Sequence, residues 1–105
     1  MTTKDQLSLC LIGLSDYRVV CDGREIGRIR LADERPDIER WDWRVNPPLP
    51  IPSWCNGSSP SLEAAKAAFR TAWEQFYETL TPSDIEHWHR SQDGARERAE
   101  RLGWW

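Results

Sequence analysis

The segment from Ser61 to Leu80 constrains the fold most strongly, because its apolar residues recur at helical spacing. These apolar positions are Leu62, Ala65, Phe69, Ala72, Trp73, Phe76 and Leu80. Side chains three and four residues apart share one face of an α-helix, so the pattern predicts a long amphipathic helix that Ser61 can cap. A helix with such an aromatic face needs an apolar surface to cover. We therefore expect the preceding residues to form that surface.

The preceding residues alternate between apolar and polar in short runs, which is the pattern of half-buried strands. The runs lie at 7–12, 17–22, 26–31 and 41–45, and the last of them directs Trp41 and Trp43 to the core. Asp22-Gly23 is a strong hairpin signal, since both positions tolerate positive φ. Ile26 is out of phase with Ile29. A β-bulge at Gly27 would bring Ile26 and Ile29 to the same face of the strand. Glycine suits a bulge because it accepts the left-handed conformation that bulges often need.

The rest of the chain predicts an arm and a second helix. Four prolines between 46 and 52 exclude a central strand, and the turn-rich residues 54–59 lead into the long helix. Thr81-Pro82-Ser83-Asp84 can start another helix, in which Gly94 favours a break and Gly103 an end. We expect an α+β fold: an antiparallel sheet of three to four strands packed on one long amphipathic helix, followed by a second C-terminal helix. Residues 1–81 form the body, with the proline-rich arm at 46–60, and residues 82–105 form a helical extension of the same single domain.

Composition narrows the possible partners and the compartment. The chain has 105 residues and a formal net charge of -3, which gives no general attraction to nucleic acid or to an anionic membrane. Met1 to Ser8 lacks a secretory signal, so we expect a cytoplasmic protein that does not bind membranes. The three cysteines, Cys10, Cys21 and Cys55, are odd in number and widely spaced, so we interpret them as buried or half-buried packing residues.

Three stretches carry a resemblance to other proteins: D-G-R-E-I-G-R-I at 22–29, W-D-W at 41–43 and S-L-E-A-A-K-A-A-F-R-T-A-W at 61–73. They resemble small uncharacterised proteins of proteobacterial genomes and their mobile elements, over most of residues 17–80. The resemblance implies a compact strand-rich half followed by a helix. It transfers no catalytic or binding residue.

Catalytic and cofactor motifs give little support for an enzyme. Glu86, His89 and Asp93 have the spacing of metal ligands on one helix face, but a di-iron site needs two such motifs, and we interpret these residues as solvent-facing. Cys55 or Cys21 with a histidine lacks a nucleophile elbow or an oxyanion loop. Phosphate-binding glycine motifs are absent. We therefore expect no catalytic residue, no metal and no cofactor.

Two surfaces remain as candidate binding sites. Strand alternation places four arginines together on the sheet face away from the helix. There they either bind phosphates or an acidic protein surface, or are neutralised by acidic neighbours such as Asp42. A second surface would join the proline arm to three tryptophans, which either bind a partner or dock within the chain. The candidate residues are Arg18, Arg28, Arg30, Arg44, Trp54, Trp104 and Trp105.

These features predict a small, non-catalytic protein-interaction module. It would act as a regulator or inhibitor, which a mobile element could encode, by binding a protein partner or as a homodimer. The alternative is a nucleic-acid-binding domain that uses the arginine-lined sheet face.

Overall fold

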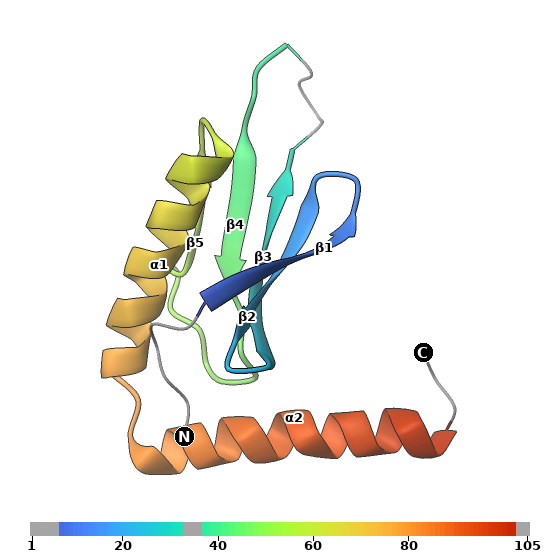
Figure 1. Ribbon diagram of the computed structural model, residues 1–105. Helices are drawn as coiled ribbons and strands as arrows, with labels where there is room; N and C mark the ends of the chain where they lie inside the picture. Colours follow the sequence, from blue (N-terminus) through green and yellow to red (C-terminus); the bar gives the residue numbers. More distant parts are fainter. Residues whose placement is uncertain (1–6, 33–36, 103–105) are drawn as a thin grey trace.

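A five-stranded antiparallel sheet forms one side of the molecule (Figure 1). The computed structural model describes residues 7–32 and 37–102, with side chains as far as Arg98. The sheet is a meander in which each strand pairs with the next. Its strands are β1 Leu7–Gly13, β2 Asp16–Cys21, β3 Arg24–Leu31, β4 Trp41–Val45 and β5 Asn56–Ser59. The predicted α+β class is confirmed, whereas the predicted three to four strands are fewer than the five observed.

The additional strand, β5, lies in the stretch predicted to be turns. It pairs with β4 through Trp43 opposite Gly57 and Asp42 opposite Ser58. Asparagine, glycine and serine have low intrinsic strand preference, so their pattern does not predict a strand. Gly57 fits because it lies under the Trp43 ring, where an added Cβ would be 2.9 Å from Cζ2. The strand is therefore held by its backbone pairing and by the neighbouring indole.

The hairpin between β2 and β3 forms as predicted. Asp22 and Gly23 both have positive φ, 53° and 78°. The predicted bulge is also present, because Val19 lies opposite Gly27 whereas the next residue of β2 lies opposite Glu25. This leaves Ile26 as the extra residue of β3, and its side chain is buried. The bulge thus puts Ile26 in the same core as Ile29.

The reason for glycine at position 27 differs from the prediction. Among the described glycines only Gly23 has a positive φ, so Gly27 is not needed for a left-handed conformation. An added Cβ at Gly27 would instead lie 2.2 Å from the Arg44 carbonyl oxygen and 2.5 Å from the Phe69 ring. Glycine is required there because the β4 backbone and a helix side chain both lie directly against the strand backbone.

Helix α1, Leu62–Glu78, packs on β3, β4 and β5. Ser61 caps it as predicted, since its Oγ accepts a hydrogen bond from the Ala64 N–H at 3.1 Å. One face of the helix is buried against the sheet and carries Ala65, Phe69, Ala72, Trp73 and Phe76. The protein core lies between this face and the inner side chains of the sheet, which include Ile26, Ile29 and Val45.

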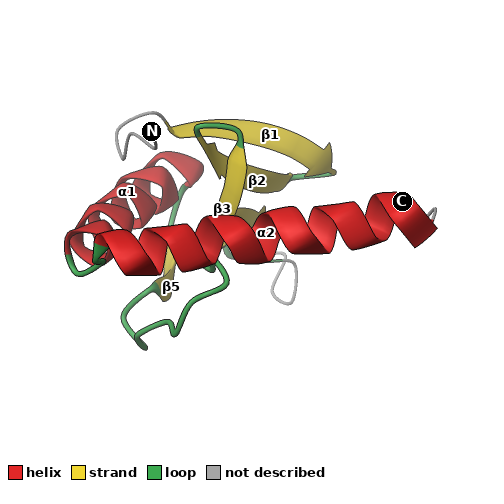
Figure 2. Cartoon of the chain, turned by 90° about the horizontal axis from the view of Figure 1, so that it is seen from below, coloured by secondary structure: helices red, strands yellow, loops and turns green. Residues whose placement is uncertain are grey.

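Helix α2, Pro82–Leu102, runs across the end of the sheet where the β2–β3 hairpin lies (Figure 2). Thr81 and Asp84 cap it reciprocally: the Thr81 N–H donates to Asp84 Oδ2 at 2.9 Å, and the Asp84 N–H donates to Thr81 Oγ1 at 3.1 Å. The predicted break at Gly94 is wrong, because the helix continues through it. One glycine costs only about 1 kcal/mol relative to alanine, which the rest of the helix can offset. The predicted end at Gly103 lies outside the described residues.

Candidate functional site

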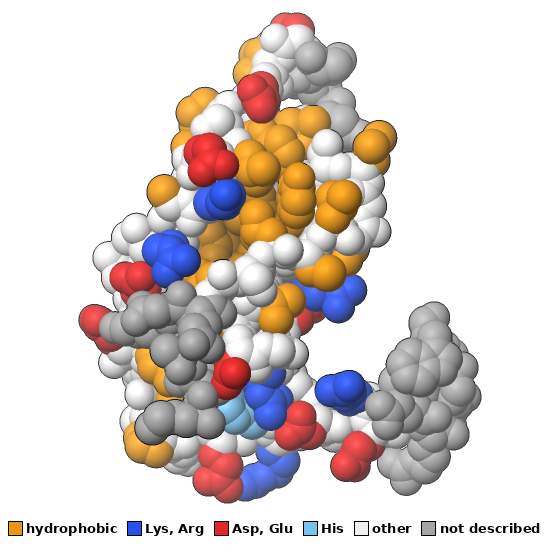
Figure 3. Space-filling view, viewed as in Figure 1, with side chains coloured by type: hydrophobic (Ala, Val, Ile, Leu, Met, Phe, Trp, Pro, Cys, Tyr) orange, Lys and Arg blue, Asp and Glu red, His pale blue; other side chains and the backbone are white. Residues whose placement is uncertain are grey.

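An apolar part of the sheet lies beside α1 rather than beneath it. On β1, three leucines point to the same side as their partners on β2. The pairs are Leu7 with Cys21, Leu9 with Val19 and Leu11 with Tyr17. Because α1 packs on β3 to β5, the side chains towards β1 become progressively more exposed, and Leu11 is 62% exposed. Figure 3 shows hydrophobic side chains gathered over the middle of this face of the molecule. Such a patch is typical of a binding surface.

A groove of about 550 Å³ separates β1 from α1. Its floor is apolar and comes from Val19, Ile29 and Phe69, while the start of β1 forms one wall. The first half of α1 forms the other wall, which carries the charged residues Glu63, Lys66 and Arg70. A groove with an apolar floor and a charged rim can remove an apolar side chain from water while its polar surroundings stay solvated.

The two edges of the sheet differ in their protection. Edge strand β5 is only four residues long, polar and followed by Pro60, which are features that discourage pairing with another chain. Edge strand β1 is seven residues long, L-S-L-C-L-I-G, and contains neither a charged residue nor proline. Its exposed backbone and apolar side chains make β1 the edge that can accept another strand. Sequence reasoning identified β1 but did not identify this property.

The four predicted arginines lie on the opposite, outer face of the sheet. Arg18, Arg28 and Arg44 stand next to one another across three strands, and Arg30 lies opposite Asp42. All four side chains are exposed. Arg28, Arg30 and Arg44 border a polar depression of about 730 Å³ that also contains Asp16 and Asp42. The sequence therefore placed these residues on one face correctly.

Acidic neighbours neutralise much of this outer face. Arg28 Nη2 lies 2.7 Å from Asp16 Oδ2, and Arg18 Nε lies 3.1 Å from Glu25 Oε1. Asp42 accepts a hydrogen bond from Ser58 at 2.6 Å. Exposed ion pairs of this kind contribute little stability, but they lower the positive potential that a phosphate would meet.

The predicted tryptophan surface is described only in part. Trp54 is 44% exposed and, together with Trp43 and one side of α1, borders a shallow depression of about 390 Å³. This depression lies on the β5 side of α1, away from the wall that β1 forms. Trp104 and Trp105 lie outside the described residues, so their contribution stays a prediction.

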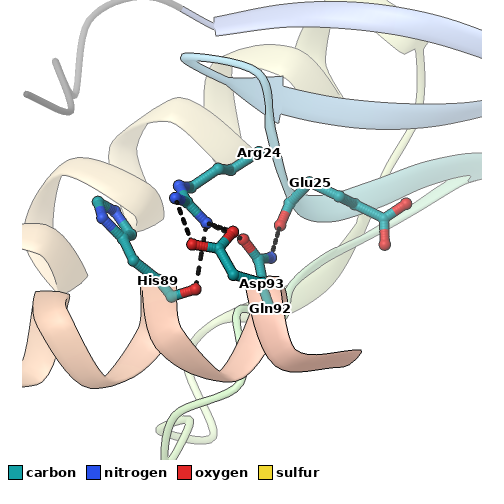
Figure 4. Close-up of polar contacts among 5 residues, drawn as sticks. All are labelled: Arg24, Glu25, His89, Gln92 and Asp93. Atoms are coloured by element: carbon teal, nitrogen blue, oxygen red, sulfur yellow. Dashed lines mark hydrogen bonds and ion pairs between the residues drawn. The ribbon is translucent and has the colours of Figure 1, made fainter. Parts of the chain in front are cut away.

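A polar cluster fixes α2 to the β2–β3 hairpin (Figure 4). Arg24 donates from Nη1 to Asp93 Oδ1 at 3.1 Å and from Nη2 to Asp93 Oδ2 at 3.3 Å, a bidentate pairing. Arg24 Nη1 also lies 3.4 Å from the His89 carbonyl oxygen, and Gln92 Nε2 donates to the Glu25 carbonyl at 2.7 Å. Sequence reasoning missed Arg24, because the cluster joins residues more than sixty positions apart. The cluster acts as a structural anchor.

Arg24 changes the titration of both neighbours. Its hydrogen bond to Asp93 holds the pKa of that carboxyl below its usual value. The pKa of His89 is also lowered, first by partial burial of the imidazole and then by the Arg24 charge. The anchor therefore depends on the ionised form of Asp93, whereas His89 takes part through its backbone carbonyl.

We expect Asp93→Asn to weaken the anchor only at pH values where Asp93 is ionised. A lowered folded-state pKa stabilises the fold above the unfolded value of about 3.9, and this contribution disappears as pH falls through the folded-state pKa. Wild type should be more stable than Asp93→Asn at pH 7, and the two should converge in acid as the pH falls through the folded-state pKa of Asp93. Urea unfolding at a series of pH values checks this, and a difference that persists in acid would contradict it.

Two of the three cysteines are buried, and Glu86 and Asp93 of the predicted metal-ligand spacing each pair with an arginine. Cys21 and Cys55 are buried as predicted, and burial raises the pKa of the Cys55 thiol, which keeps it protonated and poorly nucleophilic. Cys10 is exposed, so its prediction as a buried or half-buried residue is wrong; it sits on the outer face of an edge strand. Glu86 pairs with Arg90. In the part of the chain that the structure describes, no three His, Cys, Asp or Glu side chains converge.

Comparisons of the chain with models of known families, with curated proteins and with solved structures found no match. Between residues 7–32 and 37–102, no helix is both long and apolar enough to cross a bilayer. The resemblance to proteobacterial and mobile-element proteins stays a prediction. Functional inference therefore depends on the groove and the edge strand.

Proposed function

We propose that this chain is a non-catalytic protein-binding module whose groove between β1 and α1 receives an apolar, extended segment of a protein partner. The observation that carries the proposal is the groove beside an unprotected edge strand, on which Leu7 and Leu9 are only half-buried and Leu11 is 62% exposed. A segment that pairs with the backbone of β1 would gain main-chain hydrogen bonds, and its alternate side chains would enter the groove. Strand addition of this kind needs no cofactor.

A module of this kind acts by occupying a surface of its partner. The Cys55 thiol, protonated and buried, supports a function without covalent chemistry. Regulation or inhibition of a partner by binding is therefore the role that we propose, in agreement with the expectation from the sequence.

Nucleic-acid binding through the outer face is the second candidate, because Arg28, Arg30 and Arg44 border one polar depression. The pairing of Arg28 with Asp16 and of Arg18 with Glu25 weighs against it. Binding to nucleic acid through this face would fall steeply with salt concentration and would be lost in the double variant Arg28→Glu, Arg30→Glu. Protein binding in the groove would survive these substitutions.

We expect Ala67→Arg to abolish binding in the groove without affecting the fold. Ala67 is exposed on α1 and borders the groove, so an arginine there would fill the space and place a charge over the apolar floor. Peptides selected from a displayed library on sparsely immobilised protein should be apolar and should bind the variant at least roughly tenfold more weakly.

Two further variants identify the groove as the binding site. Ala95→Arg makes the same substitution at an exposed position of α2 and should leave peptide binding unchanged. Trp54→Ala alters the depression on the β5 side of α1, which Ala67 also borders, and should likewise have little effect. Selection of no peptide, or equal binding to wild type and Ala67→Arg, would refute the proposal.

A further inference from the structure

The pairing of β1 with β2 determines which backbone groups of β1 point outward at the open edge of the sheet. The Leu31 N–H donates to the Ser15 carbonyl at 2.9 Å, which shows that the backbone of Ser15 faces β3. Residues of an antiparallel strand alternate between their two neighbours, so the backbone of Arg18 faces β1 and pairs with Cys10. The backbone groups of the leucines on either side of Cys10 consequently point away from β2. These groups are the ones that an added strand would meet.

A second copy of β1 fits this edge in the antiparallel direction. A two-fold axis at Cys10 centres the pairing on the whole strand and places Leu9 opposite Leu11 of the partner subunit. The change of register in β1 lies between Leu11 and Gly13, beyond these central pairs. Leu9 and Leu11 point to the inner side of the sheet, and Leu9 lines the groove. The exposed Leu11 of the partner subunit would therefore enter the groove.

We propose that the occupant of the groove is a second copy of this chain: two β1 strands pair about a two-fold axis at Cys10, and each Leu11 fills the groove of the other subunit. This inference rests on the proposed function, because it names the partner for the same groove. Each copy supplies both the groove and the side chain that fills it, which is the relation that a two-fold interface requires.

Charge and edge protection both favour a closed dimer. The strand Leu7–Gly13 carries no charge, so two copies meet without like-charge repulsion. Arg18, the nearest cation on the adjacent strand, is paired with Glu25. The opposite edge, β5, is short and polar and is followed by a proline, so pairing at β1 leaves no second unprotected edge from which a fibre could grow.

Molar mass measured by light scattering over a range of concentrations tests the dimer. We expect wild type to have twice the mass of the 12.3 kDa chain at micromolar concentration. Leu11→Lys should raise the dimer dissociation constant by roughly tenfold or more, because the lysine charge would have to enter an apolar groove. Ile38→Lys is the matched control: Ile38 is 45% exposed and lies outside β1, so the dimer should persist. A monomeric wild type, or a Leu11→Lys variant that dimerises as well as wild type, would overturn the inference.

Cross-linking tests the position of the axis. Cys10 would face its own copy as a pair without mutual hydrogen bonds, at a Cα separation of about 4.5 Å, which a disulfide can span. Diamide accepts two electrons and two protons from the two thiols, so it should rapidly give a covalent dimer of wild type and none of Cys10→Ser. In the double variant Ser8→Cys, Cys10→Ser the new thiol lies opposite Ile12 of the partner subunit and should not cross-link. Equal cross-linking of this variant would overturn the proposed register.

The two proposals can fail separately. If wild type is monomeric but still binds apolar peptides in a manner that Ala67→Arg abolishes, the second copy is excluded and the protein-binding function stands. If the Cys10 cross-link forms and the dimer is unaffected by Leu11→Lys, the strands meet without use of the groove. That result would overturn the inference.

Discussion

Replacement of Trp73 by alanine is expected to lower the free energy of unfolding by about 3–5 kcal/mol. Trp73 is completely buried, and its ring centroid lies 5.6 Å from that of Tyr77 and 5.7 Å from that of Trp88. The indole therefore joins α1 to α2, and its removal leaves a cavity between the two helices. Domains of this size are stable by about 5–15 kcal/mol, so the variant would lose a large share of its stability.

Urea unfolding followed by circular dichroism measures this effect, and Trp54→Ala is the control. Trp54 loses the same side-chain atoms from a position that is 44% exposed, so its substitution should cost less than about 1 kcal/mol. A loss of less than 1 kcal/mol for Trp73→Ala would indicate that α2 does not pack on α1 through this tryptophan.

Local signals in the sequence were sufficient to predict the hairpin, the bulge and both helix starts. Each depends on residues close together in the chain: Asp22-Gly23 for the turn, Ser61 for the first helix, Thr81 and Asp84 for the second. Caps and tight turns are decided by backbone groups a few residues away, so their sequence signatures are reliable. The alternation of arginines also identified the outer face correctly, since strand period fixes which side a residue occupies.

Features that depend on distant parts of the chain were not predicted. Strand β5 exists because β4 offers it a backbone partner, and Arg24 meets Asp93 only after α2 has crossed the hairpin. Nothing in the neighbouring residues of either element carries that information. Gly94 was expected to break α2 for a local reason, but the helix continues through it, and Gln92 and Asp93 just before it contact the β2–β3 hairpin.

The groove could not be predicted from the sequence, because it results from the difference in width between the sheet and the helix that covers it. Five strands spaced by about 4.8 Å give a sheet roughly 20 Å wide, whereas one helix is about 10–12 Å across. Helix α1 therefore covers about half of the inner face, and α2 crosses the end of the sheet rather than lying beside α1. The sequence predicted both helices but not their directions. The apolar alternation of β1 was the available signal that its inner face needs a cover.

Substitution of Gly27 by alanine is expected to destabilise the protein by about 3 kcal/mol, near the upper end of the usual cost of overpacking. The added Cβ would lie 2.2 Å from the Arg44 carbonyl oxygen and 2.5 Å from the Phe69 ring. The carbonyl belongs to β4 and cannot move without disturbing the ladder between β3 and β4. The Phe69 ring is confined by Trp43, whose centroid is 6.5 Å away.

Gly23→Ala distinguishes this steric effect from a conformational one. Gly23 has a φ of +78° and no neighbouring atom within 4 Å of an added Cβ, so alanine there should cost only about 1 kcal/mol through backbone strain. If a left-handed bulge were the reason for glycine at 27, both variants would lose a similar amount in urea unfolding. A loss at Gly27 about three times that at Gly23 would instead show that the close approach of the β4 backbone and of Phe69 selects the residue.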